Sequence, residues 1–184
     1  MLSLVHTTDQ KSRNLILIGF MGTGKTTIGK RVASSLGFQF VDTDQLIVEK
    51  AGKPVTQIFE DEGEEAFRAL ETEVLRECSE DSGKVISTGG GIVTRPENRE
   101  LLEKAGFVIW LQASPETIYE RVRRNRSRPL LQTADPEGTI RELLADRAPL
   151  YKESKDFSVT TDGLTLEETC FGVTESARVA LGMG

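Results

Sequence analysis

A glycine-rich segment near the N-terminus has the residue types needed to hold phosphate groups. Residues Gly19 to Thr26 read G-F-M-G-T-G-K-T and fit the pattern G-x-x-x-x-G-K-[S/T]. Glycine lets backbone N–H groups turn toward phosphate oxygens in such a loop, where a side chain would obstruct them. Lys25 can reach the β- and γ-phosphates of a nucleotide, and the Thr26 hydroxyl can ligate Mg²⁺. The alternative is a strand-to-helix turn without a ligand.

Two aspartates could supply the carboxylates of a phosphoryl transfer. Asp42 and Asp44 come directly after the apolar run 38–41. The aspartate directly after the strand, Asp42, is well placed for metal-bound water, and Asp44 could orient or deprotonate an attacking hydroxyl. The alternative is that either aspartate caps the helix that follows, and Asp44 could combine capping with a second role.

Three consecutive glycines, Gly89-Gly90-Gly91, follow the segment V-I-S-T at 85–88. Glycine loses more conformational freedom on ordering than any other residue, so three in a row are a poor choice for a simple connector. The triplet therefore predicts that some group approaches this backbone closely. A tight strand-to-loop turn is the alternative.

Arginine is concentrated in one part of a net acidic chain. The 184 residues carry 23 Lys and Arg against 29 Asp and Glu, yet five arginines lie at 121, 123, 124, 126 and 128. The usual explanation of such a run is a solvated helix end, and the next most common is a nucleic-acid-binding patch. An arginine on a closing loop can also meet the charge of the γ-phosphate. Arg68 and Arg147 are separate candidates for anchoring an anionic substrate, although a surface ion pair is the commoner role for each.

The composition excludes several classes of site and partner. His6, the single histidine, lies in the polar N-terminal tail, so a Ser-His-Asp triad or a Cys-His pair is not expected, and one histidine cannot form a multi-histidine metal site. Cys78 and Cys170 lie far apart without a C-x-x-C pair, as expected of free thiols in a reducing compartment. The formal charge of -6 argues against a dedicated binder of nucleic acid or anionic membranes. No apolar stretch approaches the ~18 residues of a membrane span and no signal sequence is recognised, so we expect a cytoplasmic protein.

Alternating strands and helices are expected to position these residues. Short apolar runs predict strands at 15–18, 38–41, 85–87, 108–111 and 157–160. Helical spacing and caps predict helices at 25–36, 44–51, 58–79, 96–105, from 114 onward, 137–150 and 166–181, with a loop at 126–136. This alternation indicates an α/β fold whose parallel sheet is covered on both faces. Ligands of such sheets bind at the carboxyl ends of the strands, where both aspartates and the glycine triplet fall.

Six ordered motifs resemble those of the shikimate kinases, in the P-loop nucleoside-monophosphate-kinase-like group. Besides the phosphate loop and D-T-D, they are F-R-x-x-E at 67–71, S-T-G-G-G at 87–91, R-P-L-L at 128–131 and R-A-P-L-Y at 147–151. The resemblance spans about residues 15–181. It implies a three-layer α/β/α fold with a five-stranded parallel sheet in the order 2-3-1-4-5. It also implies a single P-loop kinase domain over 1–184, with a shikimate-binding segment at about 44–79 and a lid at about 125–136. Residues 1–13 are polar and aperiodic, so we expect them to form a flexible tail.

The activity implied by the resemblance is ATP-dependent phosphorylation of the 3-hydroxyl of shikimate, a step of chorismate and aromatic amino acid biosynthesis. ATP would be the co-substrate and Mg²⁺ the cofactor of a cytoplasmic monomer with no nucleic-acid or membrane partner. Nucleotide contacts would come from Gly22, Thr23, Gly24, Lys25, Thr26, Thr27, Arg121 and Arg128. Metal contacts would come from Thr26 and Asp42, and acceptor contacts from Asp44, Arg68, Gly90 and Arg147.

Three of these residues would be catalytic in the family pattern: Lys25, Asp44 and Arg128. Asp44 would assist deprotonation of the attacking hydroxyl, and Arg128 would bridge the phosphates from the lid. Arg121 would flank the adenine. The chain departs from the family at residues 161–164, T-D-G-L, where a basic residue is often found. We therefore expect adenine contacts from this loop through the backbone only.

Other functions share part of the pattern. A related sugar-acid or nucleotide kinase would have the phosphate loop but no need of two separated arginines around a small carboxylate. A nucleic-acid-binding ATPase would explain the arginine run, yet the acidic charge and the lack of an aromatic-rich basic face weigh against it. A GTP-dependent switch would need N-K-x-D, which the sequence lacks.

Overall fold

Five short strands pair side by side in one parallel sheet in the computed structural model, which describes residues 14–123 and 133–183. The strands are β1 (Leu15–Ile18), β2 (Gln39–Asp42), β3 (Lys84–Ser87), β4 (Phe107–Gln112) and β5 (Phe157–Thr160). Their order is β2-β3-β1-β4-β5, and every pairing is parallel. The predicted strand order is therefore confirmed, and all five carboxyl ends lie along one edge.

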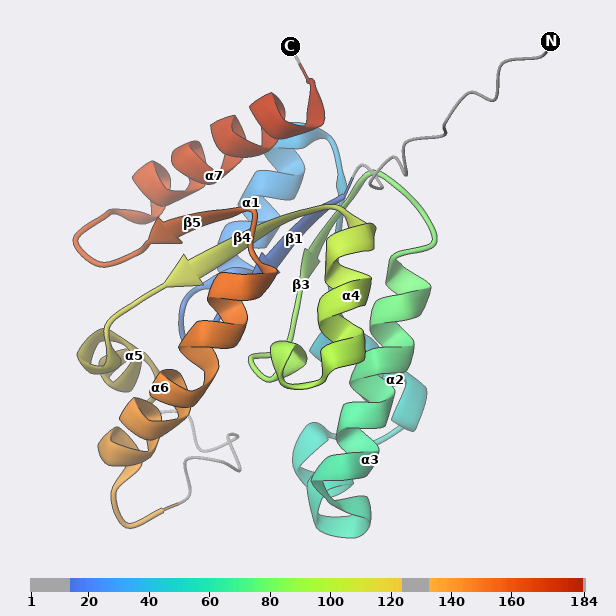
Figure 1. Ribbon diagram of the computed structural model, residues 1–184, viewed down its shortest axis with the longest axis vertical. Coiled ribbons are helices and arrows are strands. Elements are labelled where there is room, and N and C mark those ends of the chain that lie inside the picture. The colour runs from blue at the N-terminus through green and yellow to red at the C-terminus, as the bar shows by residue number, and fades with distance from the viewer. Residues whose placement is uncertain (1–13, 124–132, 184) are drawn as a thin grey trace, which may run out of the picture.

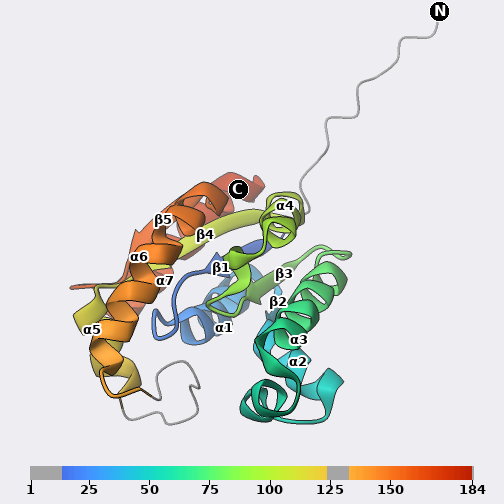
Figure 2. The same ribbon diagram turned by 60° about the horizontal axis from the view of Figure 1, so that its bottom comes forward.

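Helices cover both faces of this sheet (Figure 1). They are α1 (Lys25–Leu36), α2 (Thr43–Ala51), α3 (Val55–Cys78), the 3₁₀ turn η1 (Ile92–Thr94), α4 (Pro96–Ala105), α5 (Pro115–Val122), α6 (Pro136–Ser154) and α7 (Leu166–Leu181). Figure 2 shows α2 and α3 on one side of the β1–α1 connection and α5 and α6 on the other. The α/β/α layering expected from the sequence is present.

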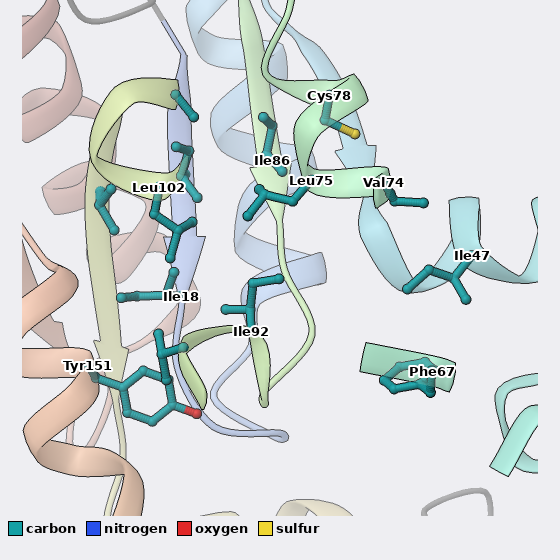
Figure 3. Close-up of a cluster of buried hydrophobic side chains, with 14 of the residues drawn as sticks. Ile18, Ile47, Phe67, Val74, Leu75, Cys78, Ile86, Ile92, Leu102 and Tyr151 are labelled. Carbon is teal, nitrogen blue, oxygen red and sulfur yellow. The ribbon is translucent and has the colours of Figure 1, made fainter. Parts of the chain in front are cut away.

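The central strand explains why its sequence is apolar throughout. Leu15 and Leu17 pack into a cluster with α1 and α7, whereas Ile16 and Ile18 pack into a cluster with α3, α4 and α6. Successive side chains of a strand point to opposite faces, so a strand covered on both faces has no polar position. Figure 3 shows Ile18 near Leu102, and Ile86 beside Leu75, in the second of these clusters. This double coverage holds β1, and the loop that follows it, in place.

Two helices differ from their predicted bounds by more than one residue. Helix α6 continues through Pro149 to Ser154 instead of ending at 150. Its last turns are held by Tyr151, which is fully buried and whose hydroxyl donates to the Gly90 carbonyl. Helix α3 begins at Val55 rather than 58 and breaks at Gly63, which has φ 83° and ψ 174°. In α6, the tertiary contacts of Tyr151 outweigh the tendency of Pro149 to end the helix.

No helix within 14–123 and 133–183 combines the length and apolarity needed to cross a bilayer. The expected tail at 1–13 and most of the expected lid, Arg128 included, lie outside the described residues.

Asn14 joins the starts of three strands, which yields a stability prediction. Its buried Nδ2 donates to the carbonyls of Asp81 (2.7 Å) and Ala105 (3.1 Å), and its Oδ1 accepts from the Lys84 N–H (3.0 Å). Asn14→Ala leaves these backbone groups without a partner, so we expect a loss of about 2 to 4 kcal/mol in the free energy of unfolding by urea. Ser35→Ala, an exposed control in α1, should change it by less than about 0.5 kcal/mol. A loss below about 1 kcal/mol for Asn14→Ala would contradict this role.

Candidate active site

The phosphate loop connects β1 to α1 and depends on glycine backbone geometry. Gly22 and Gly24 have φ of 78° and 92°, in the left-handed region that favours glycine. A Cβ at Gly22 would also lie 2.8 Å from Val122 Cγ1. Lys25 is buried, and its Nζ donates to the carbonyls of Gly19 (2.8 Å) and Phe20 (2.9 Å). Loop, lysine and helix N-terminus therefore form one compact unit, as an anion-binding loop requires.

A cavity of about 450 Å³ lies against this loop. Its wall includes residues from the phosphate loop and from the segment after β5, namely Gly22, Thr23, Gly24, Lys25, Thr26, Thr27, Thr161, Leu164, Leu166 and Thr169. Arg121 also lines it and ties the two segments together, because its Nη1 donates to the Gly22 carbonyl and to Thr161 Oγ1, both at 3.1 Å. The predicted nucleotide residues are thus gathered around one cavity, apart from Arg128, which is not described.

Asp42 and Asp44 have different structural positions. Asp42 caps α2, since its Oδ1 accepts from the N–H groups of Asp44 (3.1 Å) and Gln45 (3.4 Å). The Asp42 Oδ2 accepts from the Thr26 hydroxyl at 2.8 Å. Capping therefore belongs to Asp42, and Asp44 lies in the first turn of the helix. The pair of Asp42 and Thr26 places two hard oxygen ligands at the edge of the phosphate loop.

A second cavity of about 470 Å³ adjoins the first. The residues that line both are Met21, Thr26, Asp42, Asp44 and Gly90. Phe59, Phe67, Arg68, Glu71 and Arg147 are among those that line only the second. A phosphate donor in the first cavity and an acceptor in the second would meet at the two aspartates.

The glycine triplet after β3 is closely approached, as predicted, and the approaching groups are the protein's own charged side chains. A Cβ at Gly89 would lie against Glu71 Oε1 and 2.8 Å from Asp44 Oδ1, and one at Gly91 would collide with the guanidinium of Arg68. The Gly90 carbonyl accepts from Arg147 Nη1 at 3.3 Å. Any side chain at Gly89 or Gly91 would push these charges apart.

Arg68 and Arg147 are buried, each only 6% exposed, so neither is a surface ion pair. Arg68 Nη1 pairs with Glu71, whose side chain is fully buried. Arg68 Nε and Nη2 both donate to Glu64 Oε1, at 3.2 and 2.9 Å. The guanidinium of Arg147 lies over the Phe20 ring, 5.5 Å from its centroid. Two cations 79 positions apart are thus brought to one cavity.

Burial changes the proton affinity of the carboxyl between these arginines. It raises the pKa of Glu71 to about 6 from an ordinary value of 4.5, against the opposing effect of Arg68. The negative charge of Asp44 raises this pKa further, and Arg147 lowers it. Glu71 Oε1 is buried without a hydrogen-bond partner. Glu71 is therefore close to titrating at neutral pH while Arg68 depends on it.

Sequence reasoning assigned no role to Glu64, Glu71 or Tyr151, although the last two lie inside the motifs that carry the family resemblance. Glu71 follows Arg68 by three residues on a helix, and Glu64 precedes it by four. Both are spacings at which opposite charges meet. That spacing was the available signal. The sequence around Tyr151 contains no comparable signal, because its hydrogen-bond partner Gly90 is distant in sequence.

The family model for shikimate kinase matches residues 21–178. The chain belongs to the shikimate kinase family. A shikimate kinase of Thermodesulfovibrio yellowstonii is 48% identical over 156 residues, covering 85% of this chain and 90% of the relative. One of Neisseria gonorrhoeae is 50% identical over 145 residues, or 79% of this chain and 85% of the relative. The structure of a shikimate kinase from Acinetobacter baumannii in complex with shikimate superposes with a TM-score of 0.86 at 38% identity, covering 92% and 93% of the two chains.

The raised pKa of Glu71 predicts how the stability of this shikimate kinase family member depends on pH. A carboxyl whose pKa is higher in the folded state favours folding most when neutral, so its contribution is present below pH 4.5 and is lost as pH rises through about 6. Gln mimics the neutral acid. The free energy of unfolding of the wild type, relative to Glu71→Gln, should therefore fall by about 2 kcal/mol from pH 4.5 to about pH 7.5.

Urea unfolding of both proteins across this range measures the difference. Glu73→Gln, on an exposed part of the same helix, is the matched control and should leave a much smaller dependence. If the difference for Glu71→Gln stays constant with pH, Arg68 keeps Glu71 ionised throughout and the interpretation is wrong.

Proposed function

We propose that this chain transfers the γ-phosphoryl group of ATP to the 3-hydroxyl of shikimate. The observation that carries the proposal is the pair of adjoining cavities, whose shared wall contains Asp42 and Asp44 and whose remaining walls differ. One is bounded by a phosphate loop, and the other contains two buried guanidinium groups. Family membership and the relative solved in complex with shikimate support the choice of acceptor.

On the nucleotide side, the phosphate loop would hold the ATP phosphates through its backbone N–H groups. Lys25 would exchange its bonds to the Gly19 and Phe20 carbonyls for the β- and γ-phosphates. Arg121 would flank the adenine from its position across Gly22 and Thr161.

The same side suits Mg²⁺. Thr26 and Asp42 offer a hydroxyl and a carboxylate 2.8 Å apart. No group of three or more His, Cys, Asp or Glu side chains able to hold a metal forms among the described residues. This fits Mg²⁺, which keeps several waters and binds one or two protein oxygens together with substrate phosphates. When bound, Mg²⁺ would neutralise charge on the phosphates.

On the acceptor side, Arg68 and Arg147 would hold the shikimate carboxylate, because a guanidinium matches its two oxygens. Gly90 would contact a ring hydroxyl through its backbone. Asp44, shared by both cavities, would then face the 3-hydroxyl. The distance between the arginine wall and Asp44 would determine which hydroxyl reacts.

In the transfer step, the 3-hydroxyl oxygen attacks the γ-phosphorus while the bond from that phosphorus to the β,γ-bridging oxygen breaks. The hydroxyl proton passes to the Asp44 carboxylate, and ADP leaves. Lys25 stabilises the charge on the transferred group. We further propose, with the family pattern, that Arg128 reaches the phosphates from the lid at 125–136. The shikimate-binding segment at 44–79 and the cytoplasmic, monomeric state belong to the same proposal.

A coupled assay of ADP release tests the function. The purified chain, with ATP and MgCl₂, should turn over with shikimate and remain near background with gluconate, AMP or single-stranded DNA. Phosphorus NMR should place the new phosphate on the 3-oxygen, and EDTA should stop the reaction. Turnover that prefers gluconate or AMP, or that follows DNA, would favour the corresponding alternative enzyme.

Asp44→Asn tests the acid–base role. The amide keeps the shape of the side chain but cannot take the proton, so kcat should fall by a factor on the order of 10² or more, with a modest change in KM for ATP. Steady-state kinetics with each substrate varied gives both values. Loss of Mg²⁺ affinity as the main effect would move Asp44 to the metal site. Asp146→Asn, at an exposed position of α6, is the control.

Arg147→Lys tests the carboxylate clamp. Lysine keeps the charge but loses the fork, so KM for shikimate should rise on the order of tenfold while KM for ATP changes little. Arg178→Lys, in an exposed pair with Glu175, is the matched control and should leave both values unchanged. If the wild type phosphorylates shikimamide, the neutral carboxamide, as efficiently as shikimate, the clamp assignment is wrong.

A further inference from the structure

Arg68 forms ion pairs with two glutamates that differ in their exposure to water. Glu71 binds Nη1 and is completely buried. Glu64 binds the other edge of the guanidinium, where its Oε1 accepts from Nε at 3.2 Å and from Nη2 at 2.9 Å. The Glu64 side chain is 54% exposed. One partner is therefore enclosed with Arg68, and the other can withdraw into water.

The edge that Glu64 covers is one that a carboxylate ligand could use. Adjacent N–H groups on one side of a guanidinium match the two oxygens of a carboxylate, which makes such pairs bidentate. Arg68 lines the acceptor cavity, yet all three of its nitrogens donate to glutamates in the structure. A ligand carboxylate has to share this cation with Glu64 or displace Glu64 from it.

Displacement of Glu64 is energetically feasible. Ion pairs with a solvent-exposed partner contribute little to stability, because water solvates the released carboxylate well. Displacing Glu71 would instead leave a buried charge without a partner, which is far more costly. Of the two glutamates, Glu64 is the one that a ligand can replace.

We propose that Glu64 is a stand-in for the substrate carboxylate, occupying the Nε and Nη2 edge of Arg68 until an anionic acceptor replaces it. This inference rests on the proposed function, in which Arg68 binds the carboxylate of shikimate. Glu64 supplies a partner for a nearly buried cation before an acceptor binds. It thereby lowers the affinity for every acceptor that needs this edge, and a neutral acceptor cannot compete for it. Glu64 is thus a specificity-determining residue.

Calorimetric titration of shikimate into the nucleotide-free protein tests the inference without turnover. Glu64→Gln keeps the size of the side chain and replaces a charge-assisted contact by a neutral one, so shikimate should bind about two- to fivefold more tightly than to the wild type. Glu65→Gln is the matched control. It removes the same charge from the adjacent position, where Glu65 pairs with Arg95 and not with Arg68. Its shikimate affinity should equal that of the wild type.

Methyl shikimate, which has no carboxylate, supplies the second arm. Glu64→Gln should leave the affinity for this ester unchanged, because the ester does not compete for the edge of Arg68. Equal tightening of both ligands would mean an effect that does not involve the carboxylate, and equal tightening by Glu65→Gln would mean a general charge effect. Either result would overturn the inference. So would unchanged or weaker shikimate binding to Glu64→Gln. If the wild type itself binds no shikimate, the proposed function fails first, and the inference fails with it.

Discussion

The arrangement of the acceptor cavity depends on one constraint: charges placed in a buried wall must have partners. Arg68 and Arg147 are almost fully enclosed, and a buried guanidinium without a counter-charge or an acceptor is strongly unfavourable. Glu71 satisfies Arg68, and the Gly90 carbonyl accepts from Arg147. Glycine on either side of Gly90 leaves room for the charges against the backbone. The glycines of the S-T-G-G-G motif therefore do more than form a loop. They are needed so that the charged side chains can pack against the backbone.

The two cavities are prepared for their ligands in different ways. The nucleotide side uses backbone geometry, since left-handed glycines and a helix N-terminus present N–H groups whose direction is set by the fold. The acceptor side uses side chains held by other side chains, so its geometry depends on ion pairs that can be exchanged. The backbone of the phosphate loop can bind the phosphates of any nucleotide. The paired side chains of the acceptor cavity, in contrast, suit one acceptor. Selectivity for the acceptor is thus expected to reside in the contacts of Arg68 and Arg147.

Connections between the cavities come from side chains that serve two structural purposes. Asp42 ends β2, caps α2 and accepts from Thr26 of the phosphate loop. Tyr151 holds the end of α6 on the Gly90 carbonyl, beside Arg147 on the same helix. These contacts couple the helix carrying Arg147 and the helix carrying Asp44 to the sheet and the phosphate loop. A small shift of either helix would therefore move residues at the shared wall of the two cavities.

The local sequence determined the strands, the helices and the phosphate loop of this protein. The tertiary structure determined how the charged residues Arg68, Glu71 and Arg147 are buried together. Apolar runs and helical spacing depend on neighbouring residues, so the strands, their order by resemblance and most helix bounds were correctly predicted. The end of α6 was predicted too early, at 150, because Tyr151 is anchored on Gly90, 61 positions away. Which of Asp42 and Asp44 caps α2 stayed open, since capping depends on where this helix begins. Burial of Arg68 and Arg147, and the raised pKa of Glu71, arise only when α3, α6 and the glycine triplet enclose one space and exclude water.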